Sequence, residues 1–314
     1  ACKPYRGARV LSIASGLNQS VRARTWRRFR RHKLAMASLI VLFALTAAAA
    51  AAPLIESWLG VDAFTADLHQ RLLGPSLDHP LGTDEIGRDH LVRLLYGGRV
   101  SLTVGLIAAL FSAVIGTIIG ICAGYYGGRL DSFLMRITDS VIALPLLPLL
   151  IVLAAVDLTK LGFPEELADS EDMSLYRIVF IVSLVGWTTV ARLVRAETLS
   201  MRKREFVRAA MALGADTNRI LLTHILPNVV SPIVVATTLS VGNIILFESV
   251  LSFLGLGIQP PVASWGNMLS NAQDLVWSSP ELATWPGLFI FVTVIAFNFL
   301  GDGLQDALDP RAGD

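Results

Sequence analysis

The sequence predicts an all-α membrane protein that crosses the bilayer about six times. Of its 314 residues, 54% are hydrophobic, and the mean hydropathy is +0.60, well above that of a soluble domain. Apolar runs of about 20 residues, the length of a bilayer-spanning helix, recur along the chain. Charge is uneven, because 10 of the 26 Lys and Arg residues lie at or before Lys33. A basic cluster directly before an apolar run is typical of a cytoplasmic anchor, so we expect lipid rather than nucleic acid as its partner.

Residues 1–33 are predicted to be a cytoplasmic tail, of which the first 20 show no periodicity and are expected to be disordered. Residues 24–33 are basic and aromatic, which suits the anionic inner leaflet. The first span is predicted at 34–56. Its Ala-rich end also resembles a signal-peptide cleavage region, an alternative that leaves the later topology unchanged.

Residues 57–98 are polar and predict an outside loop with one amphipathic helix at 85–95. Four of its residues could be imagined as a metal site: His79, Asp84, Asp89 and His90. Their spacing matches no standard ligand set, so a structural loop is the favoured interpretation and no metal is expected on this chain.

Residues 99–304 predict a core domain with five further spans, near 100–125, 137–156, 176–196, 229–254 and 288–301. A short inside turn at 127–136 precedes the third span, which Pro145 and Pro148 should kink. An acidic outside loop is expected at 157–175, a rigid outside turn at 251–269, and a cytoplasmic tail at 305–314.

A stripe of small residues follows the second span at four-residue spacing: Ala108, Ser112, Gly116, Gly120 and Gly124. Helices in lipid associate through close backbone packing, so the stripe predicts a helix contact face. Whether this seam moves during function stays open. In the fifth span, Glu248 and Asn243 are candidate functional residues, because polar groups inside an apolar run normally face protein or water. The structural alternatives for Glu248 are an arginine partner or a hydrated position near the interface.

The cytoplasmic segment 197–228 is a polar insert between two spans. Its first half predicts a helix with apolar residues at helical spacing, and Arg208 points away from that face. Gly214 suits the position after the helix, Asp216 or Thr217 can cap a second short helix, and Pro227 should end it. Such a short helical pair is marginal alone, which indicates a docking element that needs a partner.

The insert resembles the EAA loop of ATP-binding-cassette (ABC) importer permeases. Five residues match that pattern, namely Ala209, Ala210, Gly214, Leu226 and Pro227. Arg208 and His224 depart from the general pattern in the way typical of the oligopeptide, dipeptide and nickel branch. Residues 79–89, 251–269 and 301–311 also resemble that branch.

The resemblance implies a type I importer permease fold and several partners: a second permease chain, two cytoplasmic ATPases and an extracytoplasmic solute-binding protein. It also implies a set of coupling residues that would contact an ATPase, namely Glu205, Arg208, Ala209, Ala210, Gly214, His224 and Pro227.

No GxxxxGK[ST], HExxH or GxSxG motif occurs, so we expect a non-catalytic subunit without a cofactor, whose ATP and Mg²⁺ are bound by partner subunits. The expected function is peptide transport across the cytoplasmic membrane of a bacterium or archaeon, with both termini inside, as the distribution of Lys and Arg indicates. Nickel or another small solute is an alternative substrate. A proton-coupled carrier that uses Glu248, alone or with Asp302, is an alternative mechanism.

Overall fold

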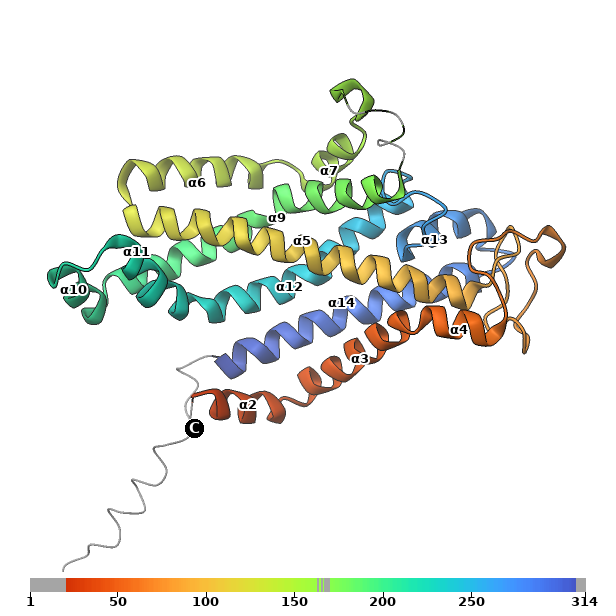
Figure 1. Cartoon of the computed structure of the whole chain (residues 1–314), viewed down its shortest axis with the longest axis horizontal. Helices are drawn as coiled ribbons and strands as arrows, with labels where there is room; N and C mark the ends of the chain where they lie inside the picture. Colours follow the sequence, from red (N-terminus) through yellow and green to blue (C-terminus); the bar gives the residue numbers. More distant parts are fainter. Residues whose placement is uncertain (1–20, 163, 165, 167–169, 309–314) are drawn as a thin grey trace, which may run out of the picture.

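The chain folds into a bundle of long helices that run back and forth along one axis, as the computed structural model shows (Figure 1). The structure describes residues 21–162, 164, 166 and 170–308. Five of the described helices are long and apolar enough to cross a membrane, and a sixth crossing is possible where two shorter helices are joined at a bend of 87°. The five are α3 (Lys33–Ala50), α5 (His90–Tyr126), α9 (Glu171–Arg202), α12 (Leu226–Phe253) and α14 (Glu281–Leu308); the bent pair is α6 (Gly128–Ala143) and α7 (Leu146–Ala154).

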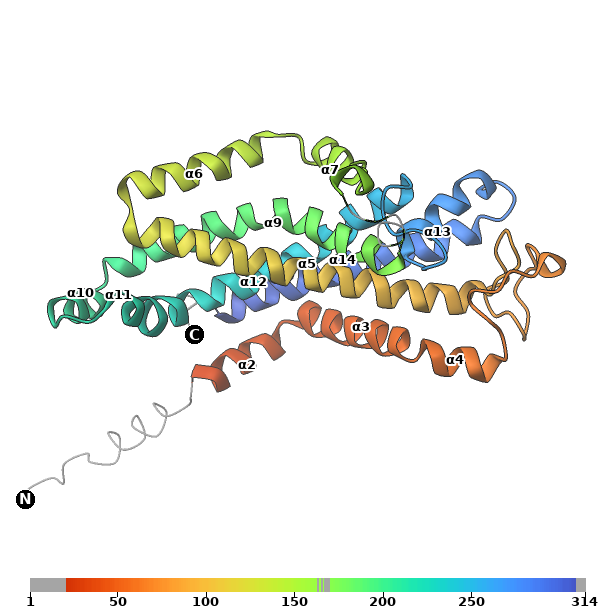
Figure 2. The same ribbon diagram turned by 45° about the horizontal axis from the view of Figure 1, so that its top comes forward.

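The bundle has two different ends (Figure 2). The end that we call the insert end carries α10 (Glu205–Ala212), α11 (Thr217–Arg219) and the π-helix η3 (Ile220–Ile225), and α2 (Val21–Arg31) lies on the same side. The opposite end, which we call the loop end, carries residues 60–89 and several short helices. These are α4 (Ala52–Leu59), α13 (Trp265–Ala272) and the 3₁₀ turns η1 (Leu68–Gln70), η2 (Thr159–Leu161) and η4 (Gln273–Leu275).

Helix α5 lies at the centre of the bundle and packs most closely against α9. The small-residue stripe makes this approach possible. A Cβ added at Gly120 would lie 2.6 Å from the carbonyl oxygen of Ala191, and one at Gly116 would lie 2.6 Å from that of Trp187. A Cβ added at Gly124 would lie 2.7 Å from Cβ of Thr198, and one added at Gly186 of α9 would lie 2.7 Å from the hydroxyl oxygen of Ser112. The stripe therefore lies at the α5–α9 seam, where larger side chains would force the backbones apart.

The predicted amphipathic helix at 85–95 does not exist as a separate element. Asp89 caps a single helix that begins at His90 and continues for 37 residues into the predicted second span. Its carboxylate accepts a hydrogen bond from the Val92 amide at 2.8 Å. The first turns are buried against the loop end, so this polar stretch is stabilised by packing that the sequence pattern did not reveal.

The predicted inside turn at 127–136 is also wrong in extent, because α6 begins at Gly128 and only Gly127 separates it from α5. The third crossing is therefore two helices rather than one kinked span. The chain leaves the helix at Leu144 and Pro145, and Pro145 precedes the new helix α7. Pro148 lies within the first turn of α7, where the missing amide proton costs little.

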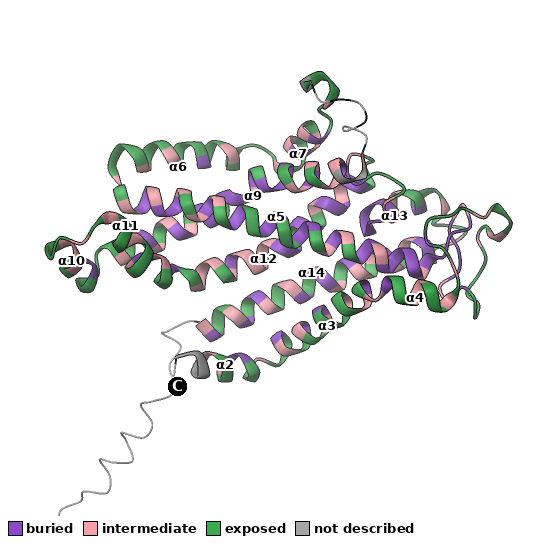
Figure 3. Cartoon of the chain, in the orientation of Figure 1, coloured by how far each residue is buried: buried purple, intermediate pink, exposed green. Residues whose placement is uncertain are grey.

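Several predicted boundaries shift. Within the predicted N-terminal tail, residues 21–31 form α2, and α14 extends through Leu308 into the predicted C-terminal tail. The predicted disordered segment 1–20 and part of the acidic loop, at 163, 165 and 167–169, lie outside the described residues. Most side chains on the outer sides of α6, α3 and α14 are exposed, as expected for surfaces that face lipid or another subunit (Figure 3).

Candidate functional site

The insert is a compact helix, turn and helix fixed to the ends of α5 and α9. Val207 of α10 is completely buried and joins an apolar cluster with Ile220 and Ile225 of the second half. The same cluster contains Val190 and Val194 of α9. The insert thus has its own small core, and its position relative to the bundle is set by apolar contact.

The turn inside the insert has the geometry that its residues predict. Gly214 adopts φ +78°, a left-handed conformation that costs a glycine little. The amide of Ala215 returns to the carbonyl oxygen of Ala210 at 3.0 Å, which closes the end of α10. Asp216 then caps α11 by accepting a hydrogen bond from the Asn218 amide at 3.2 Å.

The outward face of the insert carries both charged and apolar side chains. Glu205, Arg208 and Ala209 are exposed, whereas Ala210 is half-buried. Leu213 is 88% exposed and Phe206 is 46% exposed. The expected apolar face is therefore not the one that packs on the bundle. Val207 takes that role, whereas Leu213 points away from the protein body and Phe206 is half-exposed beside His224.

The second half of the insert does not end at Pro227, contrary to the sequence prediction. Residues 217–253 form one continuous helical run, in which the wide π-turn η3 leads directly into α12. Pro227 lies in the first turn of α12. His224, in the π-turn, places its ring 6.2 Å from that of Phe206, so the two halves of the insert also touch through aromatic side chains.

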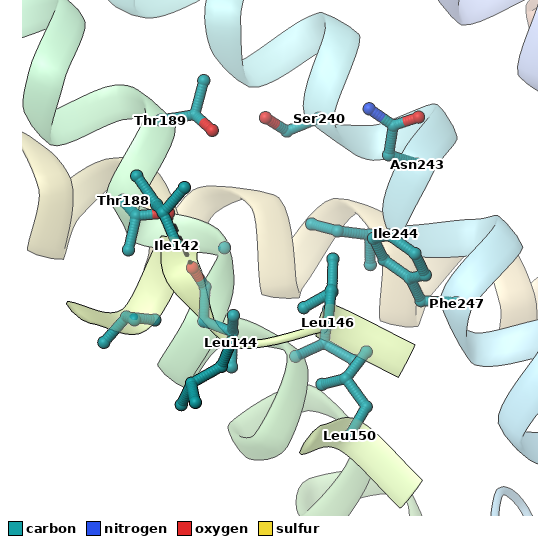
Figure 4. Close-up of a pocket in the computed structure, with 14 residues that line it drawn as sticks. Ile142, Leu144, Leu146, Leu150, Thr188, Thr189, Ser240, Asn243, Ile244 and Phe247 are labelled. Carbon is teal, nitrogen blue, oxygen red and sulfur yellow. Dashed lines mark hydrogen bonds between the residues drawn. The ribbon is translucent and has the colours of Figure 1, made fainter. Parts of the chain in front are cut away.

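A cavity of about 270 Å³ lies between α9, α12 and the junction of α6 with α7 (Figure 4). Its walls are largely apolar, but polar side chains from two facing helices line one side: Thr188 and Thr189 on α9, and Ser240 and Asn243 on α12. Thr188 is buried and donates to the carbonyl oxygen of Val185, whereas Thr189 and Asn243 are exposed. Asn243 therefore faces this cavity, as a polar group in a span requires.

Two ion pairs join α6 to α9, farther toward the insert end than this cavity. Arg192 Nη2 lies 2.5 Å from Asp139 Oδ1, and both side chains are more than half exposed. Arg195 binds both carboxylate oxygens of Asp131, at 2.5 and 2.6 Å, in a less exposed position. Sequence reasoning missed these four residues. The signal was present, since Arg192 lies in a predicted span, and the rule applied to Glu248 applies equally to it.

Glu248 is fully buried at the loop end of α12, and its described partners are hydroxyl groups rather than an arginine. Ser101 of α5 donates to Oε2 at 3.1 Å and Ser252 donates to Oε1 at 2.8 Å. Ser101 also accepts from the amide of Trp265 at 3.3 Å. Glu248 thus holds α5, α12 and α13 together, and the structure gives neither of the two alternatives considered for it.

The four loop residues considered as a metal site serve internal contacts instead. His79 Nδ1 lies 2.9 Å from Asp89 Oδ2, while Asp84 receives Arg88 Nε at 2.7 Å and lies 3.4 Å from Arg93 Nε. His90 is buried nearby, and its Nε2 has no hydrogen-bond partner among the residues that the structure describes. Among the described residues, no group of three His, Cys, Asp or Glu side chains is arranged to hold a metal ion.

A bundle of apolar helices with a folded, charged insert at one end and a polar loop region at the other defines a multi-pass membrane protein. Residues 116–314 match the family model described as binding-protein-dependent transport system inner membrane component, and residues 20–75 match the N-terminal TM domain of oligopeptide transport permease C. The chain belongs to this family of binding-protein-dependent transport permeases. The predictions of the family, of its all-α multi-span permease fold and of an ABC importer permease role are confirmed.

Characterised relatives cover nearly the whole chain. The dipeptide transport system permease protein DppC of Bacillus subtilis is 42% identical over 91% of this chain and 84% of its own length. The oligopeptide transport system permease protein OppC of Escherichia coli is 41% identical over 91% of this chain and 89% of its own length. The glutathione transport system permease protein GsiD of Escherichia coli is also 41% identical, over 91% and 89%. A chain of a solved amino acid ABC transporter aligns with a TM-score of 0.49 and 16% identity, over 67% of this chain and 91% of that one.

Proposed function

We propose that this chain is one of two permease subunits that together carry oligopeptides or dipeptides across the cytoplasmic membrane of a bacterium or archaeon. Two ABC ATPases, which bind ATP and Mg²⁺, would contact the insert end, and a solute-binding protein would deliver substrate at the loop end. The substrate class is supported by relatives named for dipeptide, oligopeptide and glutathione systems. Since no metal-ligand cluster occurs among the described residues, a dedicated nickel path is less favoured.

The observation that carries the proposal is the exposed face of the insert. The side chain of Leu213 is 88% exposed, so it contributes nothing to the stability of the isolated chain. It would contribute strongly to the free energy of binding once a partner covered it. The helix that ends at Leu213 also carries exposed charges, Glu205 and Arg208, and such a mixture is typical of a protein interface rather than a lipid-facing surface. Glu205, Arg208, Ala209 and Gly214 would form the contact with the ATPase. Ala210, His224 and Pro227 would hold its shape.

The cavity and the adjacent ion pairs support a position for the transport path. Charged and amide side chains that are exposed within spans cannot face hydrocarbon at low cost, so they indicate an aqueous surface. Arg192 with Asp139, and Asn243 with Thr189, all lie on the side of the bundle that α6 and α9 present. The second permease would close this side and complete the path. Uncharged hydroxyl and amide groups suit peptide backbones of any sequence.

The basic residues of α2 and of the insert lie at the same end of the bundle, which supports a cytoplasmic location for that end and for both termini. In this arrangement, ATP-driven closure of the ATPases would move the insert. Among the described residues, the apolar cluster around Val207 links the insert to the bundle. The continuous helical run from residue 217 into α12 forms a second link.

The test is to purify the tagged chain from its own membrane, identify the copurifying subunits, and measure ATP hydrolysis and peptide uptake after reconstitution. Leu213→Ser should remove the ATPases and abolish ATP-driven uptake. Trp277→Ser is the matched control, because Trp277 is 97% exposed at the loop end and should leave the ATPases attached. Recovery of the chain alone, with uptake driven by a proton gradient in ATP-free vesicles, would instead establish the proton-coupled carrier.

A further inference from the structure

The two ion pairs between α6 and α9 differ in how firmly they are made. Arg195 binds both carboxylate oxygens of Asp131, and the two side chains are only 33% and 16% exposed. Arg192 and Asp139 share a single hydrogen bond, from Nη2 to Oδ1, and their side chains are 52% and 57% exposed. An exposed pair with one contact contributes little to stability, so the Asp139–Arg192 pair can open at low cost.

This exposed pair keeps free groups of both signs. Among the described residues, Oδ2 of Asp139 has no hydrogen-bond partner, and neither have Nε and Nη1 of Arg192. A carboxylate oxygen can accept a hydrogen bond from an ammonium group, and a guanidinium can donate to the carboxylate of a ligand. The pair therefore offers one position for a cationic group and another for an anionic group.

The same pair lies about one helical turn from the polar cavity on both helices. On α6, Asp139 comes three residues before Ile142, which lines the cavity (Figure 4). On α9, Arg192 comes three residues after Thr189, which lines the cavity from the other helix. Three residues correspond to about 5 Å along a helix. Because the side chains that line the cavity are uncharged, Asp139 and Arg192 supply the nearest charges along these two helices.

The substrate proposed above carries charges of both signs whatever its sequence. At neutral pH an unmodified peptide has an α-ammonium group at one end and an α-carboxylate at the other. The hydroxyl and amide groups of the cavity suit the peptide backbone, but charged ends that leave water need groups of opposite charge.

We propose that Asp139 and Arg192 form a binding site for the charged ends of the transported peptide, an inference that rests on the proposed function. Asp139 accepts hydrogen bonds from the α-ammonium group, and Arg192 donates to the α-carboxylate. A peptide that replaces the contact between the two side chains leaves neither of them without a partner of opposite charge. Recognition of this kind is independent of the peptide's side chains.

The test uses the complete complex of both permeases, the ATPases and the binding protein, reconstituted in vesicles. The probes are two isomers of the tripeptide Leu-Gly-Leu in which photo-leucine replaces either the amino-terminal or the carboxyl-terminal leucine, with both ends left free. Illumination during ATP-driven uptake, followed by mass spectrometry, identifies the residues that each probe labels. The amino-end probe should label α6 around Asp139, and the carboxyl-end probe should label α9 around Arg192.

Conservative variants separate the two positions. Asp139→Asn should lower the yield of the amino-end probe several-fold, and Arg192→Gln should do the same for the carboxyl-end probe. Arg129→Gln removes an exposed arginine from the far end of α6 and should leave both yields unchanged. A pair that only joined α6 to α9 would instead lower both yields together in either variant, and that result would overturn the site.

Two further outcomes distinguish this site from the function on which it rests. Uptake of both probes by the wild type, with labels confined to other helices, would overturn the site and leave the peptide function intact. Absence of ATP-driven uptake of either probe by the wild type would overturn the proposed function, and the site with it.

Discussion

Glu248 of α12 and Ser101 of α5 are joined by a hydrogen bond of 3.1 Å between residues 147 positions apart in the chain. Because the carboxylate is completely buried, its hydroxyl partners replace the water that it would bind in solution. The same serine accepts a hydrogen bond from the backbone amide of Trp265. The indole of Trp265 in turn donates a hydrogen bond to the carbonyl oxygen of Leu94 at 2.9 Å. This network fixes the loop-end helix α13 to the two central spans.

Replacement of Glu248 by Ala should therefore destabilise the complex by about 2 to 4 kcal/mol, because it leaves a cavity and removes the acceptor for two buried hydroxyl groups. Glu248→Gln keeps an acceptor oxygen of similar size and should cost less. The measurement is the Tm of the purified complex together with ATP-driven uptake. A Gln variant with normal Tm but no transport would show that Glu248 has a role beyond holding helices together.

Gly120→Ala should weaken the α5–α9 seam. The new Cβ would lie 2.6 Å from a backbone carbonyl oxygen that cannot rotate away, so the helices must separate, at a cost of about 1 to 3 kcal/mol. Gly287→Ala in α14 is the matched control, since its added Cβ would meet only a leucine methyl group at 4.0 Å. Thermal stability in detergent distinguishes them. Equal Tm values for the two variants would mean that the seam can relax without loss.

Arg192→Gln should change which peptides pass rather than how stable the protein is. An ion pair this exposed contributes about 0 to 1 kcal/mol to stability. Loss of a positive charge beside an aqueous path should disfavour anionic peptides relative to cationic ones by roughly fivefold, the effect of about 1 kcal/mol. The ratio of uptake rates for two peptides of opposite charge checks this. An unchanged ratio would place Arg192 away from the path.

Asn243→Cys should react with a membrane-impermeant maleimide, whereas Leu106→Cys should not. Both positions are exposed on the isolated chain, but Asn243 lies in the polar cavity and Leu106 lines an apolar groove between α5 and α12. Thiols react as thiolates, which form in water and not in hydrocarbon. The background needs Cys2 and Cys122 replaced by Ser and Ala. Equal labelling of the two sites would show that the cavity is not aqueous.

The features that sequence reasoning recovered depend on local chemistry. Apolar run length predicted the spans, and Gly214 and Asp216 predicted the turn inside the insert, because each effect acts within a few residues. The small-residue stripe lies at a helix seam for the same reason, since four-residue spacing alone places its members on one face.

The features that it missed depend on distant partners. The first half of α6 is predicted as a turn because Arg129, Asp131 and Arg136 lower the hydropathy of residues 127–136, yet Asp131 pairs with Arg195 of α9, 64 residues away. The error at Pro227 has another cause. Proline has no amide proton and is tolerated in the first turn of a helix, and Pro227 lies in the first turn of α12, directly after the π-turn η3.

The unbroken run at 217–253 also has a mechanical consequence. A helix of 37 residues is about 55 Å long, so this run reaches as one rod from the insert to the buried network at Glu248, with the π-turn η3 and Pro232 as the points where it bends most easily. A tilt of about 10° at one tip would displace the other by roughly 10 Å, if the rod pivots at its end. Force applied at one membrane surface would then reach the opposite surface within a single element.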